Sequence, residues 1–183
     1  MVRLKPVAIP IMLIYFGLNL VMAGSIFNCS GNVVSPTVLQ TAKIKAARYT
    51  FKRDPKVSKE PNYFIKTTPC YDAAAFKGKN TIIFSEAVVR DFSIEELAAM
   101  MGHEFGHLES RQKMEHWEID AIGVELAGRS AMLGALNKSV FKIRNMFDDN
   151  QILIYVFPFS YLSYHLAINQ FKSRIEKIEN LSD

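Results

Sequence analysis

At residues 101–107 the chain reads Met101-Gly102-His103-Glu104-Phe105-Gly106-His107, which contains the pattern H-E-x-x-H. On an α-helix, His103 and His107 lie one turn apart on the same face. Two imidazoles at that spacing can bind one zinc ion, and Glu104 beside them can take a proton from a water on that ion. The same pattern is also compatible with a surface helix that carries two histidines and a glutamate in a salt bridge.

A helix around this motif is predicted from its own start signal. Ser93, followed three residues later by Glu96, is a capping box, so the helix should begin near Ile94. Apolar residues then recur with helical spacing at Ile94, Leu97, Ala98, Met101, Phe105 and Leu108. Gly102 and Gly106 each cost about 1 kcal/mol relative to alanine inside a helix, so we expect another part of the chain to pack closely against them, with or without a function.

Composition limits the classes of protein that this chain can belong to. Its 183 residues fit one domain of ordinary size, and 49% apolar residues are enough for a sizeable core. The formal charge of +4 is mild, and basic residues are scattered among acids. The densest basic cluster, residues 52–59, lies among acids and Pro55, which is typical of a solvated loop. We therefore expect no nucleic-acid partner.

Residues 1–24 are predicted to be a signal peptide or an N-terminal membrane anchor. Arg3 and Lys5 precede an uncharged apolar run, Val7–Ala23, and about 17 residues is short for a membrane span, which needs ~20. Positive charge before the run places the domain of residues 25–183 outside the cytoplasm, either secreted or periplasmic and held at the inner membrane by residues 7–23. A buried N-terminal helix of a cytosolic domain is the other interpretation.

The chain has two cysteines, Cys29 and Cys70, and both follow the N-terminal apolar run. In a non-cytoplasmic compartment they could form a disulfide, and they could equally be two unrelated thiols. Neither has C-x-x-C spacing, so a cysteine zinc site is not expected.

Between the cysteines and the motif, the pattern predicts one helix and two strands. Ser35-Pro36 has the character of an N-cap and first helical residue, and helical spacing runs from Thr37 to Tyr49. Residues 62–68 and 80–85 are rich in β-branched and aromatic side chains and are expected to be strands. They form either a small sheet whose edge lies over the metal, where an extended peptide could add as a strand, or an ordinary hairpin.

A second helix is expected from about Glu115 to Asn137, and it should supply the third zinc ligand. His116 and Asp120 are one turn apart and share a face, so His116 is the first choice as ligand, with Asp120 orienting a histidine through a hydrogen bond. Glu115 and Glu118 are the alternative ligands, and a solvent-facing His116 is also compatible with the sequence.

The C-terminal part begins with a second apolar run, residues 151–171, which contains Pro158 and His165. A proline and a histidine argue against a clean membrane span, so burial or contact with a membrane interface is favoured. Residues 172–181 are predicted to form a short charged helix.

From about Pro61 to Ala135 the chain resembles the HtpX-like, CAAX-prenyl-endopeptidase-type zinc metallopeptidases, which are gluzincins of the forty-eighth metallopeptidase family. The matching pieces occur in the family's order: Ala75-Phe76 in a strand-like segment, the hydrophobic strand at residues 80–85, the Glu95–Ala99 segment, the H-E-x-x-H helix and Ile119-Asp120-Ala121-Ile122-Gly123. The segment at residues 173–178 is similar to the family's closing arginine-isoleucine segment.

The resemblance implies a zinc endopeptidase with His103 and His107 as ligands and Glu104 as general base. It also implies that Asp120 does not bind the metal itself but contacts one of its ligands. One position departs from the family, because the third ligand there is a glutamate four residues before the aspartate, and here that place is His116. The site could therefore use three histidines, it could recruit Glu115 or Glu118 by a local shift, or it could have lost activity.

Together these observations predict an α+β, mainly helical zincin-like domain, with a small sheet beside the H-E-x-x-H helix and a hydrophobic N-terminal helix. We expect Zn²⁺ as cofactor and a peptide or protein as substrate, aligned by the strand at Ile82, Ile83 and Phe84. Arg174, Tyr164 and His165 are candidates for stabilising the oxyanion. The alternatives are a catalytically inactive zinc-binding or interaction module, and a membrane-tethered structural protein whose motif is fortuitous and binds no metal.

Overall fold

The structure is a computed structural model that describes residues 29–57, 59–110, 114–148 and 158–181. The N-terminal segment, predicted to be a signal peptide or anchor, and residues 151–157 of the second apolar run lie outside the described residues. Within the described ranges, no helix is both long and apolar enough to cross a membrane. The chain divides into two compact units, one of Met1–Asn28 and Ile143–Gln170, and one of Cys29–Lys142 and Phe171–Asp183.

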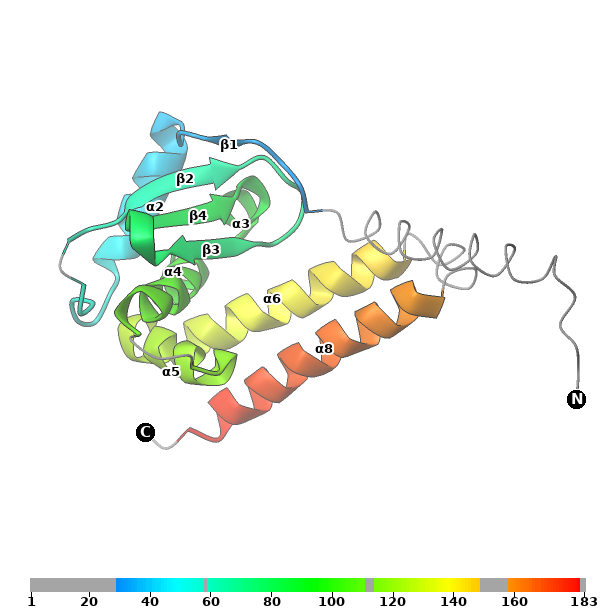
Figure 1. Cartoon of the computed structure of the whole chain (residues 1–183). Coiled ribbons are helices and arrows are strands. Elements are labelled where there is room, and N and C mark those ends of the chain that lie inside the picture. The colour runs from blue at the N-terminus through cyan, green and yellow to red at the C-terminus, as the bar shows by residue number, and fades with distance from the viewer. Residues whose placement is uncertain (1–28, 58, 111–113, 149–157, 182–183) are drawn as a thin grey trace, which may run out of the picture. The chain divides into compact units, whose positions relative to one another are not determined.

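The second unit contains a four-stranded sheet in the order β1-β2-β4-β3 (Figure 1). Its strands are β1 (Val33–Val34), β2 (Asn62–Lys66), β3 (Ala73–Phe76) and β4 (Thr81–Ser85). Strands β2 and β4 are the two strands predicted from the sequence, and they lie parallel to each other, whereas β1–β2 and β3–β4 are antiparallel. The hairpin interpretation is therefore wrong, because parallel neighbours require a crossover, which here passes through β3.

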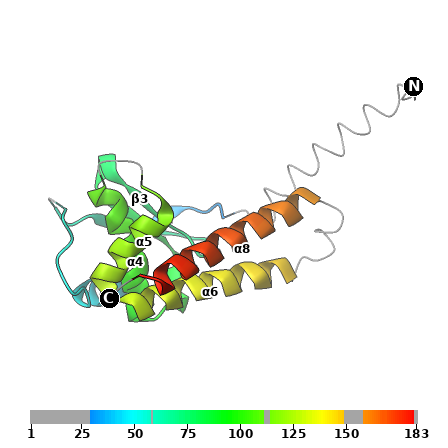
Figure 2. The same ribbon diagram turned by 90° about the horizontal axis from the view of Figure 1, so that it is seen from below.

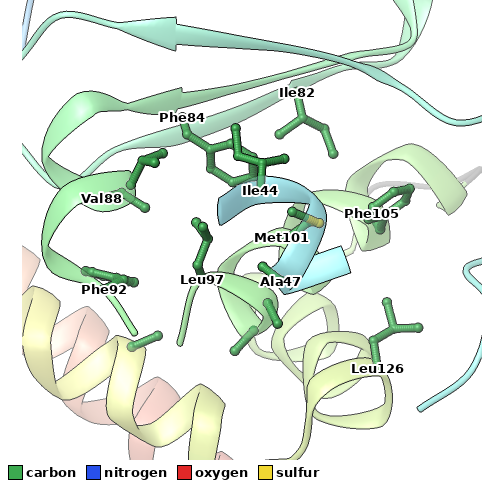
Figure 3. Close-up of a cluster of buried hydrophobic side chains, with 14 of the residues drawn as sticks. Ile44, Ala47, Ile82, Phe84, Val88, Phe92, Leu97, Met101, Phe105 and Leu126 are labelled. Carbon is green, nitrogen blue, oxygen red and sulfur yellow. The ribbon is translucent and has the colours of Figure 1, made fainter. Parts of the chain in front are cut away.

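Two helices follow the predicted capping and spacing signals closely, and a short third helix was not predicted from the sequence. α2 (Val38–Tyr49) begins two residues later than Ser35-Pro36 predicted, because Thr37 accepts a hydrogen bond from Gln40 and forms a capping box. α3 (Glu86–Asp91) is short, and α4 (Ile94–Glu109) is the motif helix. One face of the sheet and these helices enclose the core (Figure 3), whose largest fully buried side chains include Phe84, Phe92, Phe105, Ile44, Ile82, Leu97 and Met101.

The helix predicted from Glu115 to Asn137 is two helices, α5 (His116–Ala127) and α6 (Arg129–Asp148). The break is at Gly128, whose φ of +105° is a backbone conformation that residues with a side chain rarely adopt. Apolar spacing continues through the break, so the periodicity alone suggested one helix. Gly128 is the signal that marks the end of α5.

Cys29 and Cys70 form a disulfide with Cα atoms 5.5 Å apart. It links the segment before β1 to the segment before β3. The sequence left this pairing open, and the two cysteines in the structure are paired with each other.

The described residues of the first unit are the end of α6 and the start of α8 (Pro158–Glu179), a helix that continues into the second unit. Pro158 begins this helix, where its missing N–H costs no intrahelical hydrogen bond, instead of breaking it. The charged helix predicted at residues 172–181 is thus the last part of α8. Tyr164 and His165 belong to the first unit, with ring centroids 5.1 Å apart, and their proposed oxyanion role stays a prediction.

Candidate metal centre

Helix α4 presents the motif residues in a buried setting. It begins at Ile94 as predicted, because Ser93 Oγ accepts from the Glu96 N–H at 3.1 Å and the Glu96 carboxylate accepts from the Ser93 N–H at 2.7 Å. His103 is 6% exposed and Glu104 is 3% exposed. Side chains of these types are rarely buried without a partner or a function, so the interpretation of the motif as a solvated surface helix is wrong.

Helix α5 lies directly against α4 (Figure 2), and glycines allow this close approach. A Cβ placed on Gly102 would be 2.9 Å from the Cα of Gly123, and one on Gly106 would be 3.0 Å from the Ile119 side chain. Real Cβ atoms essentially never come as close as 2.9 Å, so the two backbones approach each other as only glycines permit. This close approach brings His116, the first residue of α5, to the two histidines of α4.

The close packing predicts a stability cost for Gly102→Ala. Alanine is the better helix former by about 1 kcal/mol, but its Cβ would meet backbone that cannot move aside, and overpacking of this kind costs about 1–3 kcal/mol. We expect the variant to lower the free energy of unfolding in urea. Gly78→Ala is the control, because no atom lies within 4 Å of a Cβ built there, and its free energy of unfolding should stay within about 0.5 kcal/mol of the wild type. Equal stability of the two variants would contradict the packing argument.

The three histidines converge on one point. His103, His107 and His116 each offer one ring nitrogen, and these nitrogens lie within 4.8 Å of one another. The Nε2 atoms of His103 and His107 are 3.2 Å apart. Two nitrogens at about 2.0–2.1 Å from a tetrahedral zinc are about 3.3 Å apart, so this pair already has the spacing of two ligands. The donor set fits a metal ion that prefers imidazole.

Two of these imidazoles are kept neutral by their surroundings. Burial, and then repulsion from His103 and His116, lowers the pKa of His107 to about 4. Burial, followed by repulsion from Arg174, also lowers the pKa of His116. A metal ligand must carry a free lone pair, and at neutral pH these rings carry one.

Asp120 and Arg174 hold His103 in place. Asp120 is completely buried, and its Oδ1 lies 2.7 Å from His103 Nδ1. Arg174 donates to the same carboxylate from Nε at 2.6 Å and from Nη2 at 2.7 Å. Burial by itself would raise the pKa of Asp120, but the hydrogen bonds from Arg174 and His103 outweigh it, and the pKa lies below its usual value. The ionised carboxylate favours the tautomer with the proton on Nδ1, which turns the Nε2 lone pair of His103 toward His107.

Glu104 is a buried carboxyl group with unused hydrogen-bonding capacity. Burial, with further repulsion from Asp72 and Asp120, raises its pKa to about 8, against the opposing effects of a hydrogen bond from the Ala75 backbone and of Arg174. Its Oε2 is buried and has no hydrogen-bond partner among the described residues. A strongly shifted acid beside three converging imidazoles is typical of a functional site.

The alternative third ligands are occupied elsewhere. The Glu118 carboxylate accepts from the Glu115 N–H at 2.7 Å, and the Glu115 carboxylate accepts from Trp117 Nε1 at 2.7 Å and lies 3.7 Å from Lys177 Nζ. These contacts hold both carboxylates at the start of α5, with Lys177 reaching Glu115 from α8. Among the candidates that the sequence offered, His116 is therefore the residue placed beside His103 and His107.

The sheet edge nearest to Glu104 is β3, which corrects the prediction for Ile82, Ile83 and Phe84. These three residues lie in β4, whose backbone is paired with β2 on one side and with β3 on the other, so β4 has no edge to which a peptide strand could add. Ile82 and Phe84 are fully buried. The sequence pattern missed β3 as a separate strand because alanine is a poor strand former, and the family resemblance at Ala75-Phe76 was the signal that pointed to it.

Arg174 also has a different place from the predicted one. Its Nε and Nη2 are directed at the Asp120 carboxylate, so it supports His103 through Asp120 instead of facing a substrate oxyanion.

Two histidines one helical turn apart, a third histidine from the neighbouring helix and a buried glutamate define a candidate metallopeptidase centre. A model of peptidase family M48 matches residues 37–179, and the chain belongs to this family. No match was found among curated proteins or among solved structures.

Proposed function

We propose that the chain is a zinc-dependent metalloendopeptidase that hydrolyses peptide bonds. The observation that supports this most directly is the convergence of three imidazoles beside the buried carboxyl of Glu104. Zinc suits the donor set, because it takes imidazole nitrogens in tetrahedral geometry, and three protein ligands leave a fourth position for water or substrate. His103, His107 and His116 would hold the ion.

The chain's own residues then have distinct roles. When bound, zinc would polarise the scissile carbonyl and lower the pKa of the attacking water. Glu104, whose pKa is raised by burial, would be favoured in its ionised form by the positive charge of the bound ion. The ionised carboxylate accepts a proton from that water and passes it to the leaving amine. Asp120 fixes the orientation and tautomer of His103, and Arg174 keeps Asp120 ionised and in place.

The position of β3 suggests how a peptide lies in the site. The Ala75 backbone donates to Glu104, so this edge strand runs beside the general base. An extended peptide that adds to β3 would pass the site with both of its ends free to continue, which favours cleavage of internal bonds. The same geometry assigns peptides or unfolded protein segments as the substrate class.

We also propose that the domain works outside the cytoplasm. The Cys29–Cys70 disulfide supports an oxidising compartment, and the apolar run at residues 7–23 supports export, with either removal of the segment or anchoring to a membrane.

Metal removal tests the proposal. We expect the zinc-loaded full-length chain to cleave unfolded casein, the chelator 1,10-phenanthroline to stop cleavage, and added Zn²⁺ to restore it, whereas Mg²⁺ should not, because it prefers oxygen ligands. Fragment patterns from mass spectrometry would show whether internal bonds are cut. Cleavage that continues after complete zinc removal would contradict the proposal.

One observation favours a second candidate, a zinc-binding module without catalytic activity. His116 stands where the resembled family has a glutamate, and a changed ligand set is a route by which a peptidase scaffold loses activity. This candidate predicts that the chain binds zinc and cleaves none of the peptides tested, so turnover separates the two.

A further inference from the structure

The face of the sheet that points away from the core is apolar and partly exposed. The register places Phe64, Ile83 and Ala74 in one row across β2, β4 and β3. Phe76 of β3 and Val33, which pairs with Lys66, lie on the same face of the sheet two residues away along the strands, and they are 46% and 51% exposed. We call these five residues the outer sheet face. The neighbouring Ile82 and Phe84 point to the opposite side, into the core (Figure 3).

A hollow lies in the outer sheet face next to the edge strand. It has a volume of about 130 Å³, and Ala74, Phe76 and Ile83 line it, with the Lys66–Asp72 ion pair at one end. A cavity of about 150 Å³ holds benzene, so the hollow has room for one aromatic ring or a similar apolar group. Ala74 contributes only a methyl group to its wall and belongs to β3, so the hollow reaches toward the sheet edge.

The hydrogen-bond pattern fixes which backbone groups of β3 face outward. The Ser85 N–H donates to the Asp72 carbonyl at 2.8 Å, which marks these two residues as a hydrogen-bonded pair. Such pairs alternate along antiparallel strands, so Ala74 is bonded to Ile83, and the backbone groups of Ala73 and Ala75 point away from β4. The Ala75 N–H is the group that donates to Glu104.

A peptide that pairs antiparallel with this edge would therefore be placed in a definite register. Its backbone would bond to the outward groups of Ala73 and to the Ala75 carbonyl, since the Ala75 N–H is already donated to Glu104. The peptide residue between these contacts would lie opposite Ala74 in a non-hydrogen-bonded pair. Cβ atoms in such pairs are about 4.5–5.5 Å apart and share a face of the sheet. That side chain would point to the outer sheet face, beside the methyl group of Ala74 and the hollow.

We infer that the hollow is a substrate subsite for a large apolar or aromatic side chain, and that Ala74 determines this preference. The inference rests on the proposed function. The subsite adjoins the reacting bond, because Ala75, the next residue, donates to the general base.

Peptide binding tests the inference without requiring turnover. The full-length, zinc-loaded Glu104→Gln protein is titrated into labelled octapeptides that carry Thr at odd positions and one residue type, Phe, Ser, Glu or Lys, at even positions, and fluorescence anisotropy gives Kd. We expect the Phe peptide to bind about tenfold more tightly than the Ser peptide. Adding Ala74→Lys should remove the preference for Phe and favour the Glu peptide over the Lys peptide. Adding Ala74→Glu should also remove the preference for Phe, but it should favour the Lys peptide over the Glu peptide.

The control is Val38→Lys, which adds the same positive charge as Ala74→Lys. Val38 lies on α2 and is 90% exposed. It should leave the order of affinities unchanged. Equal affinity for all peptides, no binding, or a Phe preference that survives both Ala74 substitutions would overturn the inference. Self-association through this face without any peptide preference would assign the face to a second copy of the chain and would also overturn it. Failure of the proposed function has a different signature, because the peptides would then bind to the variant and remain uncut by the wild type.

Discussion

Glu104→Gln should lower kcat/KM for peptide hydrolysis by about 10²–10⁴-fold while the zinc content stays unchanged. Glutamine has nearly the same shape but cannot accept the proton of the attacking water. The loss should not come from unfolding, because Glu104 is buried with one oxygen that has no hydrogen-bond partner among the described residues, and a neutral amide avoids the cost of a buried charge. Steady-state kinetics on a peptide cut by the wild type, together with elemental analysis, measures both quantities.

The control for Glu104→Gln is Glu95→Gln on the same helix. Glu95 is exposed in the first turn of α4, so this change also removes one negative charge but leaves the site intact. It should keep kcat/KM within about twofold of the wild type, since surface changes of this kind are worth within about 0.5 kcal/mol. Hydrolysis that survives Glu104→Gln, or that falls equally in both variants, would remove Glu104 from the mechanism.

His116→Ala should weaken zinc binding by more than about 100-fold. Residues that only orient a ligand contribute about 10–100-fold to metal affinity, so the loss of a ligand itself should exceed that range. His116→Glu should bind zinc much more tightly than His116→Ala, because it restores a carboxylate donor at the same position of α5. Competition with a chromophoric chelator at fixed pH gives the three affinities.

Asp120→Asn shows, for comparison with His116→Ala, how much zinc affinity depends on a residue that orients a ligand without binding the metal. Its carboxylate lies 2.7 Å from Nδ1 of His103, so the isosteric amide should cost about 10–100-fold in zinc affinity, less than His116→Ala.

A zinc affinity that is unchanged in His116→Ala would exclude His116 as a ligand and return Glu115 or Glu118 as candidates.

The parts of the site that the sequence predicted correctly depend on local interactions. The start of α4 follows from the capping box of Ser93 and Glu96, whose partners are three residues apart. The relative position of His103 and His107 follows from one turn of helix. His116 was the preferred candidate for a similar local reason, since it lies one helical turn before Asp120 and shares a face with it. The structure adds that Glu115 and Glu118 cap the start of α5 instead.

The parts that the sequence missed depend on contacts between distant segments. Arg174 reaches Asp120 across 54 residues, and no local pattern announces that ion pair. Strand β3 is a run of alanines that becomes a strand only by pairing with β4, so its propensity gave no strong signal. The division of α5 from α6 depended on one glycine within an unbroken apolar pattern.

Anomalous scattering at the zinc absorption edge, from crystals of the zinc-loaded full-length chain, tests the three-histidine centre most directly. A single anomalous peak at about 2.0–2.1 Å from one nitrogen each of His103, His107 and His116 is the predicted result. No peak among these nitrogens, or a peak whose third protein ligand is the carboxylate of Glu115 or Glu118, would contradict it.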